Sequence, residues 1–221
     1  MHSEFTFAEE NYLKAIYHLS KAGQEDVSTN AIAELLHTKP ASVSDMIQKL
    51  AKKELVNYKK YRGVNITNSG KKVAIAIIRK HRLWEVFLVE KLKFHWDEVH
   101  EVAEELEHIR SPLLVNRLEE FLDHPQFDPH GDPIPDADGK IKIKPRQPLC
   151  DLGTDDSGVV VNVTDSSNLF LQYLDKLGIK IGTKVKIVDK IPYDGSIHII
   201  LDGKKNVSIS KEVSENLLVT S

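Results

Sequence analysis

The chain has 221 residues, with 30 basic against 33 acidic side chains and a formal net charge of -3, and it is 41% hydrophobic and 29% charged. This composition is ordinary for a folded globular protein and excludes the disordered and low-complexity classes. The single cysteine, Cys150, excludes an internal disulfide and a cysteine-based zinc finger. No apolar run approaches the roughly 18 residues of a membrane helix and the first residues lack a signal-peptide pattern, so we expect a cytoplasmic protein with no membrane partner.

Charge is distributed unevenly along the chain. Between Leu36 and Lys72 nine basic residues face two acidic ones, whereas between Glu85 and Asp138 fifteen acidic residues face four basic ones. A basic segment suits a polyanion, and an acidic segment suits cations or a basic partner. Two unrelated solvated surfaces would give the same pattern.

The first part of the chain predicts three helices followed by a hairpin. The helices are expected over residues 5–20, 31–36 and 41–53, and the two strands over residues 55–58 and 64–67. Ser28 and Thr29 offer an N-cap for the second helix, and Pro40 is well placed in the first turn of the third. Two short helices joined by a tight turn, a packed third helix and a basic hairpin are typical of a winged helix-turn-helix, so we predict DNA binding.

The rest of the chain predicts more helices and then a β-rich region. Helices are expected over residues 71–91, 97–109, 113–122 and 168–177, and β-rich runs over residues 159–163, 185–188, 197–201 and 207–209. The proline- and glycine-rich stretch 124–139 is expected to be a loop or linker. The predicted fold class is therefore mainly α with a small β domain.

The second helix of the helix-turn-helix pair is expected in a major groove, and the hairpin turn on the DNA backbone or in the minor groove. Lysines there would contact phosphates, while hydroxyl and apolar groups would touch base edges. The candidate DNA-binding residues are Thr38, Lys39, Pro40, Ala41, Ser42, Ser44, Asp45, Lys49, Lys52, Lys59, Lys60, Tyr61 and Arg62. We place no Arg, Asn or Gln on the front of this helix, which predicts modest or partly shape-based specificity. The alternative is a three-helix core whose lysines only confer solubility.

A set of imidazoles and carboxylates predicts a divalent metal site. At about 100° per residue, one arc of the helix expected over residues 97–109 carries His100, Glu104, Glu107 and His108, opposite Val102, Leu106 and Ile109. His81 and Glu85 share a face of the preceding helix. So many neighbouring carboxylates are unfavourable without a cation, and N/O ligands favour Mn²⁺ or Fe²⁺, with Zn²⁺ also able to bind. The alternative is an amphipathic helix with an acidic solvent face.

Over nearly its whole length the chain resembles the DtxR/MntR family of metal-dependent transcriptional repressors. The resemblance is carried by six ordered segments, AEENYLKAIY, KPASVSDMIQKL, YRGVNITNSGKK, RKHRLWE, VHEVAEELEH and HGDPIP, and by the β-rich C-terminal region. It implies a winged helix over residues 1–70, a helical dimerisation and metal-binding domain over 71–147 and an SH3-like (FeoA-like) β-barrel over 148–221. It also implies a homodimeric repressor of metal homeostasis that responds to Mn²⁺ or Fe²⁺ and binds palindromic operators in double-stranded DNA.

The resemblance also implies two metal sites. The primary site would use Asn11, Glu104, Glu107 and His108, and an ancillary site would use His81, Glu85 and His100, with Asp128, His130 and Asp165 as further candidates. Asn11 stands where well-known members have Met or Asp. Glu104 stands where iron-type members have cysteine and manganese-type members have glutamate, so manganese is implied. Lys14 stands where a member with a paired-ion site has glutamate, which argues against that two-ion arrangement.

Two other functions remain open alternatives. A winged-helix regulator that responds to an organic ligand would have a mainly apolar pocket. A metal-dependent hydrolase would need an open coordination position and a positioned base. The sequence contains no glycine-rich phosphate loop and no nucleophile–base signature, so we expect that the protein is not an enzyme.

Overall fold

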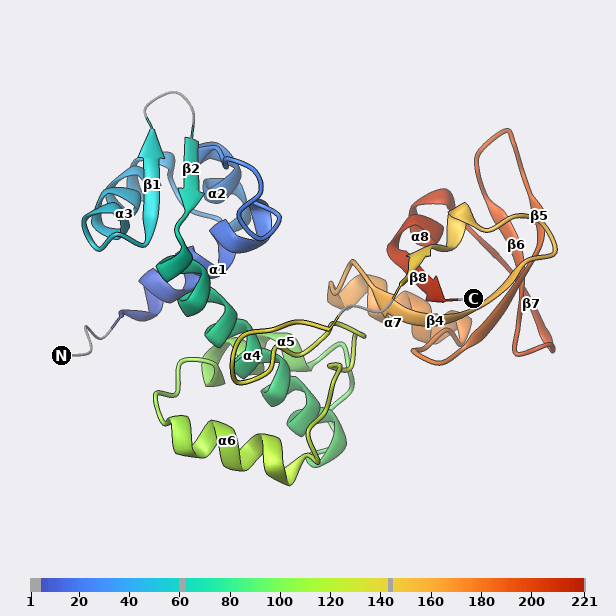
Figure 1. The fold of residues 1–221 in the computed structure, drawn as a ribbon. Coiled ribbons are helices and arrows are strands. Elements are labelled where there is room, and N and C mark those ends of the chain that lie inside the picture. Colours follow the sequence, from blue (N-terminus) through green and yellow to red (C-terminus); the bar gives the residue numbers. More distant parts are fainter. Residues whose placement is uncertain (1–4, 60–62, 143–144, 221) are drawn as a thin grey trace. The chain divides into compact units, whose positions relative to one another are not determined.

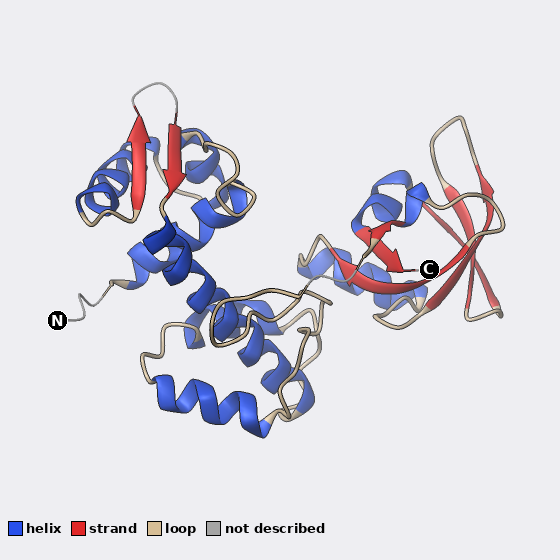
Figure 2. Cartoon of the chain, in the orientation of Figure 1, coloured by secondary structure: helices blue, strands red, loops and turns tan. Residues whose placement is uncertain are grey.

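The structure is a computed structural model that describes residues 5–59, 63–142 and 145–220. The chain forms two compact units, the first built from Met1–His81, Glu104–Pro112 and Pro135–Lys140, and the second from Arg82–Ala103, Leu113–Ile134 and Ile141–Ser221. Helices make up most of the first two thirds of the chain, and strands gather in the last third (Figure 2). Among the described residues, no helix is long and apolar enough to span a membrane.

The first unit begins with three helices and a hairpin (Figure 1). These elements are α1 (Phe7–Leu19), α2 (Thr29–Leu35), α3 (Pro40–Lys52), β1 (Val56–Lys59) and β2 (Gly63–Ile66). Thr6 and Glu9 form a reciprocal capping box at the start of α1. Ser28 Oγ accepts the N–H of Ala31 at 3.1 Å, and Pro40 occupies the first turn of α3. The predicted winged helix-turn-helix order is therefore present.

Apolar side chains from all three helices form the core of this part. The largest fully buried ones are Leu13, Ile16, Ile32, Ile47 and Leu50. Burying each such side chain contributes about 1.5–3 kcal/mol. Val27 forms an isolated antiparallel bridge with Val64 of β2. This packing fixes the rotation of α3 about its axis, and so decides which of its residues face solvent.

Three further helices follow, α4 (Asn68–Glu90), α5 (Val99–Leu106) and α6 (Pro112–Phe121). The α5 helix ends three residues before the predicted end, so Glu107 and His108 lie in the turn that follows it. Both are buried, whereas Val102, Leu106 and Ile109 are only half-buried. The expected apolar side of this helix, with Val102, Leu106 and Ile109, is therefore not its buried side, which is formed by Val99 and Ala103.

The C-terminal part is a six-stranded antiparallel sheet with the strand order β3-β8-β4-β5-β6-β7. Its strands are β3 (Gln147–Pro148), β4 (Ser157–Val163), β5 (Lys184–Lys190), β6 (Ile197–Leu201), β7 (Lys205–Ile209) and β8 (Leu217–Thr220). The helices are α7 (Asn168–Leu177), α8 (Lys211–Asn216) and a 3₁₀ turn, Leu149–Asp151. All four predicted β-rich runs are strands, while β3, β8 and α8 were not predicted.

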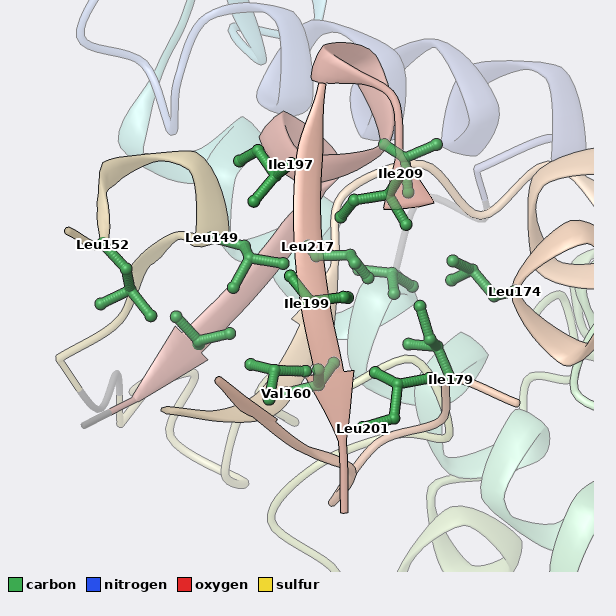
Figure 3. Packing of buried hydrophobic residues seen from close by; sticks show 14 of the residues in the cluster. Leu149, Leu152, Val160, Leu174, Ile179, Ile197, Ile199, Leu201, Ile209 and Leu217 are labelled. Carbon is green, nitrogen blue, oxygen red and sulfur yellow. The ribbon is translucent and has the colours of Figure 1, made fainter. Parts of the chain in front are cut away.

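The sheet and its helices enclose a separate apolar core (Figure 3). Leu174 of α7 packs with Val160, Ile199 and Leu217 of the sheet, and all four are fully buried. Leu149 of the 3₁₀ turn is also fully buried there. The predicted fold class, mainly α with a small β domain, is confirmed.

Gly131 lies close to the backbone of β4, so a substitution at this position tests how closely the two segments pack. Its φ is +87°, and a Cβ on it would lie 1.9 Å from the Val161 carbonyl oxygen. We expect Gly131→Ala to lower the free energy of unfolding by more than about 2 kcal/mol, because both the backbone and its neighbour must move.

Gly182→Ala is the matched control, because Gly182 has a φ of +93° and no atom within 4 Å of its Cβ position. Gly182→Ala should lower the free energy of unfolding by only about 1–2 kcal/mol, which is the strain of an alanine in the left-handed backbone region. Urea denaturation of both variants measures the difference, and equal losses would contradict the close approach at Gly131.

Candidate metal centres and nucleic-acid interface

The buried carboxylate of Glu107 lies at the centre of a polar cluster in the first unit. Lys14 Nζ, on α1, lies 2.8 and 2.9 Å from the two Glu107 oxygens and 3.2 Å from Glu104 Oε1. His81 Nδ1, on α4, lies 2.7 Å from Glu107 Oε2. We call Lys14, His81, Glu104 and Glu107 the Glu107 cluster.

Lys14 supplies positive charge to this cluster from within the chain. Burial raises the pKa of Glu107, but the hydrogen bond with His81 and the positive charge of Lys14 outweigh burial, so the pKa lies below its usual value. Glu107 is therefore ionised at neutral pH. The Lys14 ammonium supplies a compensating positive charge that α1 brings to the turn after α5.

A second contact joins α1 to the same turn. His108 Nδ1 lies 2.5 Å from Glu10 Oε2, both residues are buried, and the Phe7 ring stacks on the imidazole at 4.4 Å between centroids. A carboxylate at one ring nitrogen orients the imidazole and directs the other nitrogen, Nε2, away, as in many histidines that bind metals. Glu10 was not predicted from the sequence. Its one signal is its position four residues before Lys14, on the same helix face.

Asn11 lies on α1 between these two contacts, one residue after Glu10 and three before Lys14. Its Oδ1 atom is buried and accepts no hydrogen bond within the described part of the chain. A buried acceptor without a partner costs about 1–3 kcal/mol, which a ligated cation would offset. The predicted primary-site residues offer only oxygen and nitrogen atoms, and so fit a divalent ion such as Mn²⁺. Their role as ligands stays a prediction.

The second unit contains another cluster, formed by Glu85, Asp128 and His130. One ligand atom from each lies within 4.8 Å of the others, and all three residues are buried. His130 Nε2 contacts the Trp96 carbonyl oxygen at 2.8 Å and must therefore carry a hydrogen, which leaves Nδ1 facing Glu85 Oε2 at 3.7 Å. An imidazole whose other N–H is bound by a carbonyl is a common arrangement in metal sites. We call these three residues the Glu85 cluster.

The pKa values of Asp128 and His130, the two partners of Glu85, are both raised. Burial, together with the charges of Glu85 and Asp132, raises the pKa of Asp128. Burial lowers the pKa of His130, but the contact with Glu85 and the charge of Asp128 outweigh burial and raise it. The same electrostatic field that favours protons in the Glu85 cluster favours a metal cation.

The predicted ancillary residues are distributed over both units. His81 belongs to the first unit and contacts Glu107, whereas His100 Nδ1 lies 3.6 Å from Glu85 Oε1 in the second. Asp165 Oδ1 accepts the N–H of Ser167 just before α7, and Asp165 is not among the described residues that cluster with Glu85.

Two supporting groups of the Glu85 cluster were not predicted. They are the Trp96 carbonyl and Asn162, whose Nδ2 donates to the His130 carbonyl oxygen at 3.0 Å. Neither group has a signal in the local sequence.

The α3 helix presents a polar face opposite its core residues. Of the predicted DNA-binding residues, the exposed ones are Lys39, Pro40, Ala41, Ser42, Asp45, Lys49 and Lys52, while Thr38 and Ser44 are half-buried. Ser44 Oγ donates to the Pro40 carbonyl oxygen at 3.0 Å. Lys59 is the last residue of β1, and Lys60, Tyr61 and Arg62 lie outside the described residues.

The expectation that no amide side chain lies on the front of α3 was wrong. Gln48 is exposed, three residues after Asp45 and four before Lys52, which places it in the middle of the exposed face. The core residues Ile47 and Leu50 fix this rotation. A glutamine in that position can form two hydrogen bonds with an adenine edge.

Models of known protein families match three consecutive parts of the chain. Residues 4–64 match "iron dependent repressor, N-terminal DNA binding domain", and residues 67–136 match "iron dependent repressor, metal binding and dimerisation domain". Residues 147–221 match the FeoA domain.

Relatives of known sequence and structure support the same grouping. The iron-dependent repressor IdeR of Mycobacterium tuberculosis is 35% identical over 133 residues, which are 60% of this chain and only 57% of that protein. The diphtheria toxin repressor of Corynebacterium glutamicum is 30% identical over 87% of this chain and 91% of its own length. A manganese-dependent transcriptional repressor in complex with manganese has 35% identity and a TM-score of 0.87, covering 96% of this chain and 99% of that one. The manganese regulator SloR has 32% identity and a TM-score of 0.77, and the match covers 96% of this chain and 97% of SloR.

The contact of the Lys14 ammonium with both Glu107 oxygens predicts the effect of replacing Lys14. Lys14→Met keeps most of the side chain but removes the ammonium, which leaves Glu107 buried without that charge. We expect a loss of about 3–5 kcal/mol in the free energy of unfolding in the presence of a chelator. Because Mn²⁺ can supply the missing charge, we also expect Mn²⁺ to raise the melting temperature of the variant more than that of the wild type.

Lys21→Met is the control, because Lys21 pairs with Glu25 at 2.7 Å and its side chain is 69% exposed. Loss of this exposed ion pair should lower the free energy of unfolding by less than about 1 kcal/mol. A Lys14→Met protein as stable as the wild type without metal would contradict the role assigned to Lys14.

Proposed function

The chain belongs to the DtxR/MntR family of iron- and manganese-dependent repressors, and from this membership we propose that it is a transcriptional repressor activated by a divalent metal ion. The proposed target is an operator in double-stranded DNA. The observation that carries the proposal is the pairing of α1, which belongs to the winged helix, with Glu104, Glu107 and His108 of the metal-binding segment.

Asn11, Glu104, Glu107 and His108 would hold the activating ion. When bound, the ion supplies positive charge between α1 and the turn after α5. The α1 helix shares its core with α2 and α3, so restraining α1 also restrains the DNA-reading helix. Ordering this part before DNA binding removes that entropic cost from the DNA step. A coupling free energy of about 1–3 kcal/mol corresponds to roughly 5–150-fold in affinity.

We propose Mn²⁺ as the activating ion, with Fe²⁺ as the alternative and Zn²⁺ able to bind in vitro. The donor set contains no thiolate, which favours the harder dications. Lys14 contacts both Glu107 oxygens, which supports a single ion rather than a pair at the primary site. The Glu85 cluster, with His100 3.6 Å from Glu85, supports an ancillary site in the second unit.

We propose that the repressor acts as a homodimer on a palindromic site, with its two α3 helices about one DNA turn apart. The family assigns dimerisation to residues 67–136. The second unit exposes a set of large apolar side chains there that a partner would cover, namely Leu92, Phe94, Leu113, Leu114 and Phe121. A DNA-binding repressor acts where the operator lies, which supports a cytoplasmic location.

The domain boundaries near residues 70 and 147 also stay a proposal. A non-enzymatic role is supported by the family, whose named relatives are repressors. The polar contacts at α1 favour a metal over an organic effector, because a site for an organic ligand is mainly apolar.

Glu104→Gln tests the metal switch. The Glu104 side chain is 46% exposed, so the substitution should leave folding intact while removing one charged ligand. We expect Mn²⁺ to raise wild-type affinity for operator DNA roughly 5–150-fold over a chelator, and the variant to lose most of this gain. Fluorescence anisotropy with labelled DNA, with and without Mn²⁺, measures both.

Glu105→Gln is the matched control, since Glu105 is the exposed neighbour on α5 and is not a candidate ligand. It should respond to Mn²⁺ as the wild type does. Equal wild-type affinity with Mn²⁺ and with a chelator would overturn the metal switch but leave DNA binding intact.

Gln48→Ala tests base reading by α3. We expect the preferred sequence, selected from a random DNA pool, to lose its advantage at one position by about 1–3 kcal/mol, while the salt dependence of binding stays unchanged. Lys52→Ala should instead weaken binding to all sequences and reduce the slope of log K against log salt by about 0.9. If Gln48→Ala weakened all sequences equally, Gln48 would not read a base.

A further inference from the structure

A third group of metal-ligating side chains lies apart from the two clusters described above. His95 and Asp97 lie in the segment between α4 and α5, and Asp175 lies on α7. One ligand atom from each lies within 4.8 Å of the others. We propose that His95, Asp97 and Asp175 form a third metal site, which binds a divalent transition metal and fastens α7 to the segment between α4 and α5.

A neutral donor holds one oxygen of each carboxylate in this group. Trp96 Nε1 donates to Asp175 Oδ2 at 3.0 Å, and Gln172 Nε2 donates to Asp97 Oδ2 at 2.9 Å. These bonds fix both carboxylates and leave Oδ1 of each as the available ligand. Outer hydrogen bonds of this kind orient the ligands of metal sites.

Within the described part of the chain, the remaining oxygen atom of each carboxylate, Oδ1, is at most weakly paired. Asp175 Oδ1 is buried and accepts no hydrogen bond within the described part of the chain. Asp97 is 9% exposed, and its Oδ1 lies 3.9 Å from His95 Nδ1, beyond hydrogen-bond distance. Two carboxylates in partly buried surroundings repel each other unless a cation lies between them.

The chain supplies only weak compensation for this charge. Among the described residues, Lys180 Nζ lies 3.5 Å from Asp175 Oδ1, and its side chain is 66% exposed. Solvent screens such an exposed ion pair, which contributes little. The His95 side chain is 69% exposed, so its imidazole can move the short distance needed to complete a site, and water can fill the remaining positions.

The donor set indicates the class of metal. One imidazole nitrogen and two carboxylate oxygens suit Mn²⁺, Fe²⁺ or Zn²⁺, whereas Ca²⁺ prefers six to eight oxygen ligands and Cu⁺ prefers thiolates or thioethers. The ion would also fix Trp96, whose carbonyl oxygen contacts His130 of the Glu85 cluster. The proposal does not depend on the primary site or on DNA binding.

The test counts metal ions per chain. The full-length protein is dialysed against Mn²⁺ and, separately, against Zn²⁺, and bound metal is measured for the wild type, His95→Ala, Asp175→Asn and His124→Ala. We expect His95→Ala and Asp175→Asn each to bind one ion fewer per chain than the wild type. His124→Ala is the matched control, because His124 Nδ1 also lies 3.9 Å from one carboxylate, that of Glu119, and its side chain is 66% exposed. Among the described residues, His124 belongs to no group of three potential ligands.

Anomalous scattering from crystals soaked in Mn²⁺ or Zn²⁺ gives a second measurement, which stays decisive if Asp175→Asn fails to fold. A peak between the three side chains supports the proposal. An unchanged ion count in His95→Ala, or the absence of a peak in fully soaked wild-type crystals, overturns it. Because Glu104→Gln should leave this third ion in place, failure of the metal switch and failure of the third site give different results.

Discussion

The buried charge of Glu107 is the constraint on which the arrangement of the first unit depends. Lys14 and His81 bring α1 and α4 to this one carboxylate, which follows α5 in the sequence. Removing one partner of a buried ion pair costs about 3–5 kcal/mol, so α1 cannot move away from the carboxylate unless another cation takes its place. A metal ion bound at Glu107 would therefore be linked to the position of α1, because both would depend on the charge next to the same oxygen atoms.

In the Glu85 cluster, the negative charge of the buried carboxylates is compensated in a different way. Arg82 is shared between Asp128 at 3.5 Å, Asp132 at 3.4 Å and the Pro133 carbonyl oxygen at 2.6 Å, so its charge is not dedicated to one carboxylate. The raised pKa values of Asp128 and His130 show that protons take up part of the compensation. A metal ion would displace protons at the Glu85 cluster, whereas at the Glu107 cluster it must share oxygens with an ammonium that the chain itself provides.

Local patterns in the sequence predicted most helices and strands, because apolar spacing and capping residues act within one element. The α7 helix matches its predicted range, and Ser28 caps α2 as expected. Contacts between distant residues could not be predicted in this way. Glu10 meets His108 across 98 residues and Asn162 meets His130 across 32, and neither pairing leaves a mark on the neighbouring sequence. Gln48 was missed for a related reason, since the rotation of α3 is fixed by core residues of other elements.

Trp96 contacts residues of two groups of potential ligands that lie far apart in the sequence. Its carbonyl oxygen contacts His130, and its indole N–H donates to Asp175 of α7. Any shift of the segment between α4 and α5 therefore changes a ligand orientation in the Glu85 cluster and a carboxylate position on α7 together. The polar groups of Trp96 thus connect α7 with the segment before α5 and also orient potential ligands, so a cation bound at either place would stabilise the other through the backbone and side chain of this one residue.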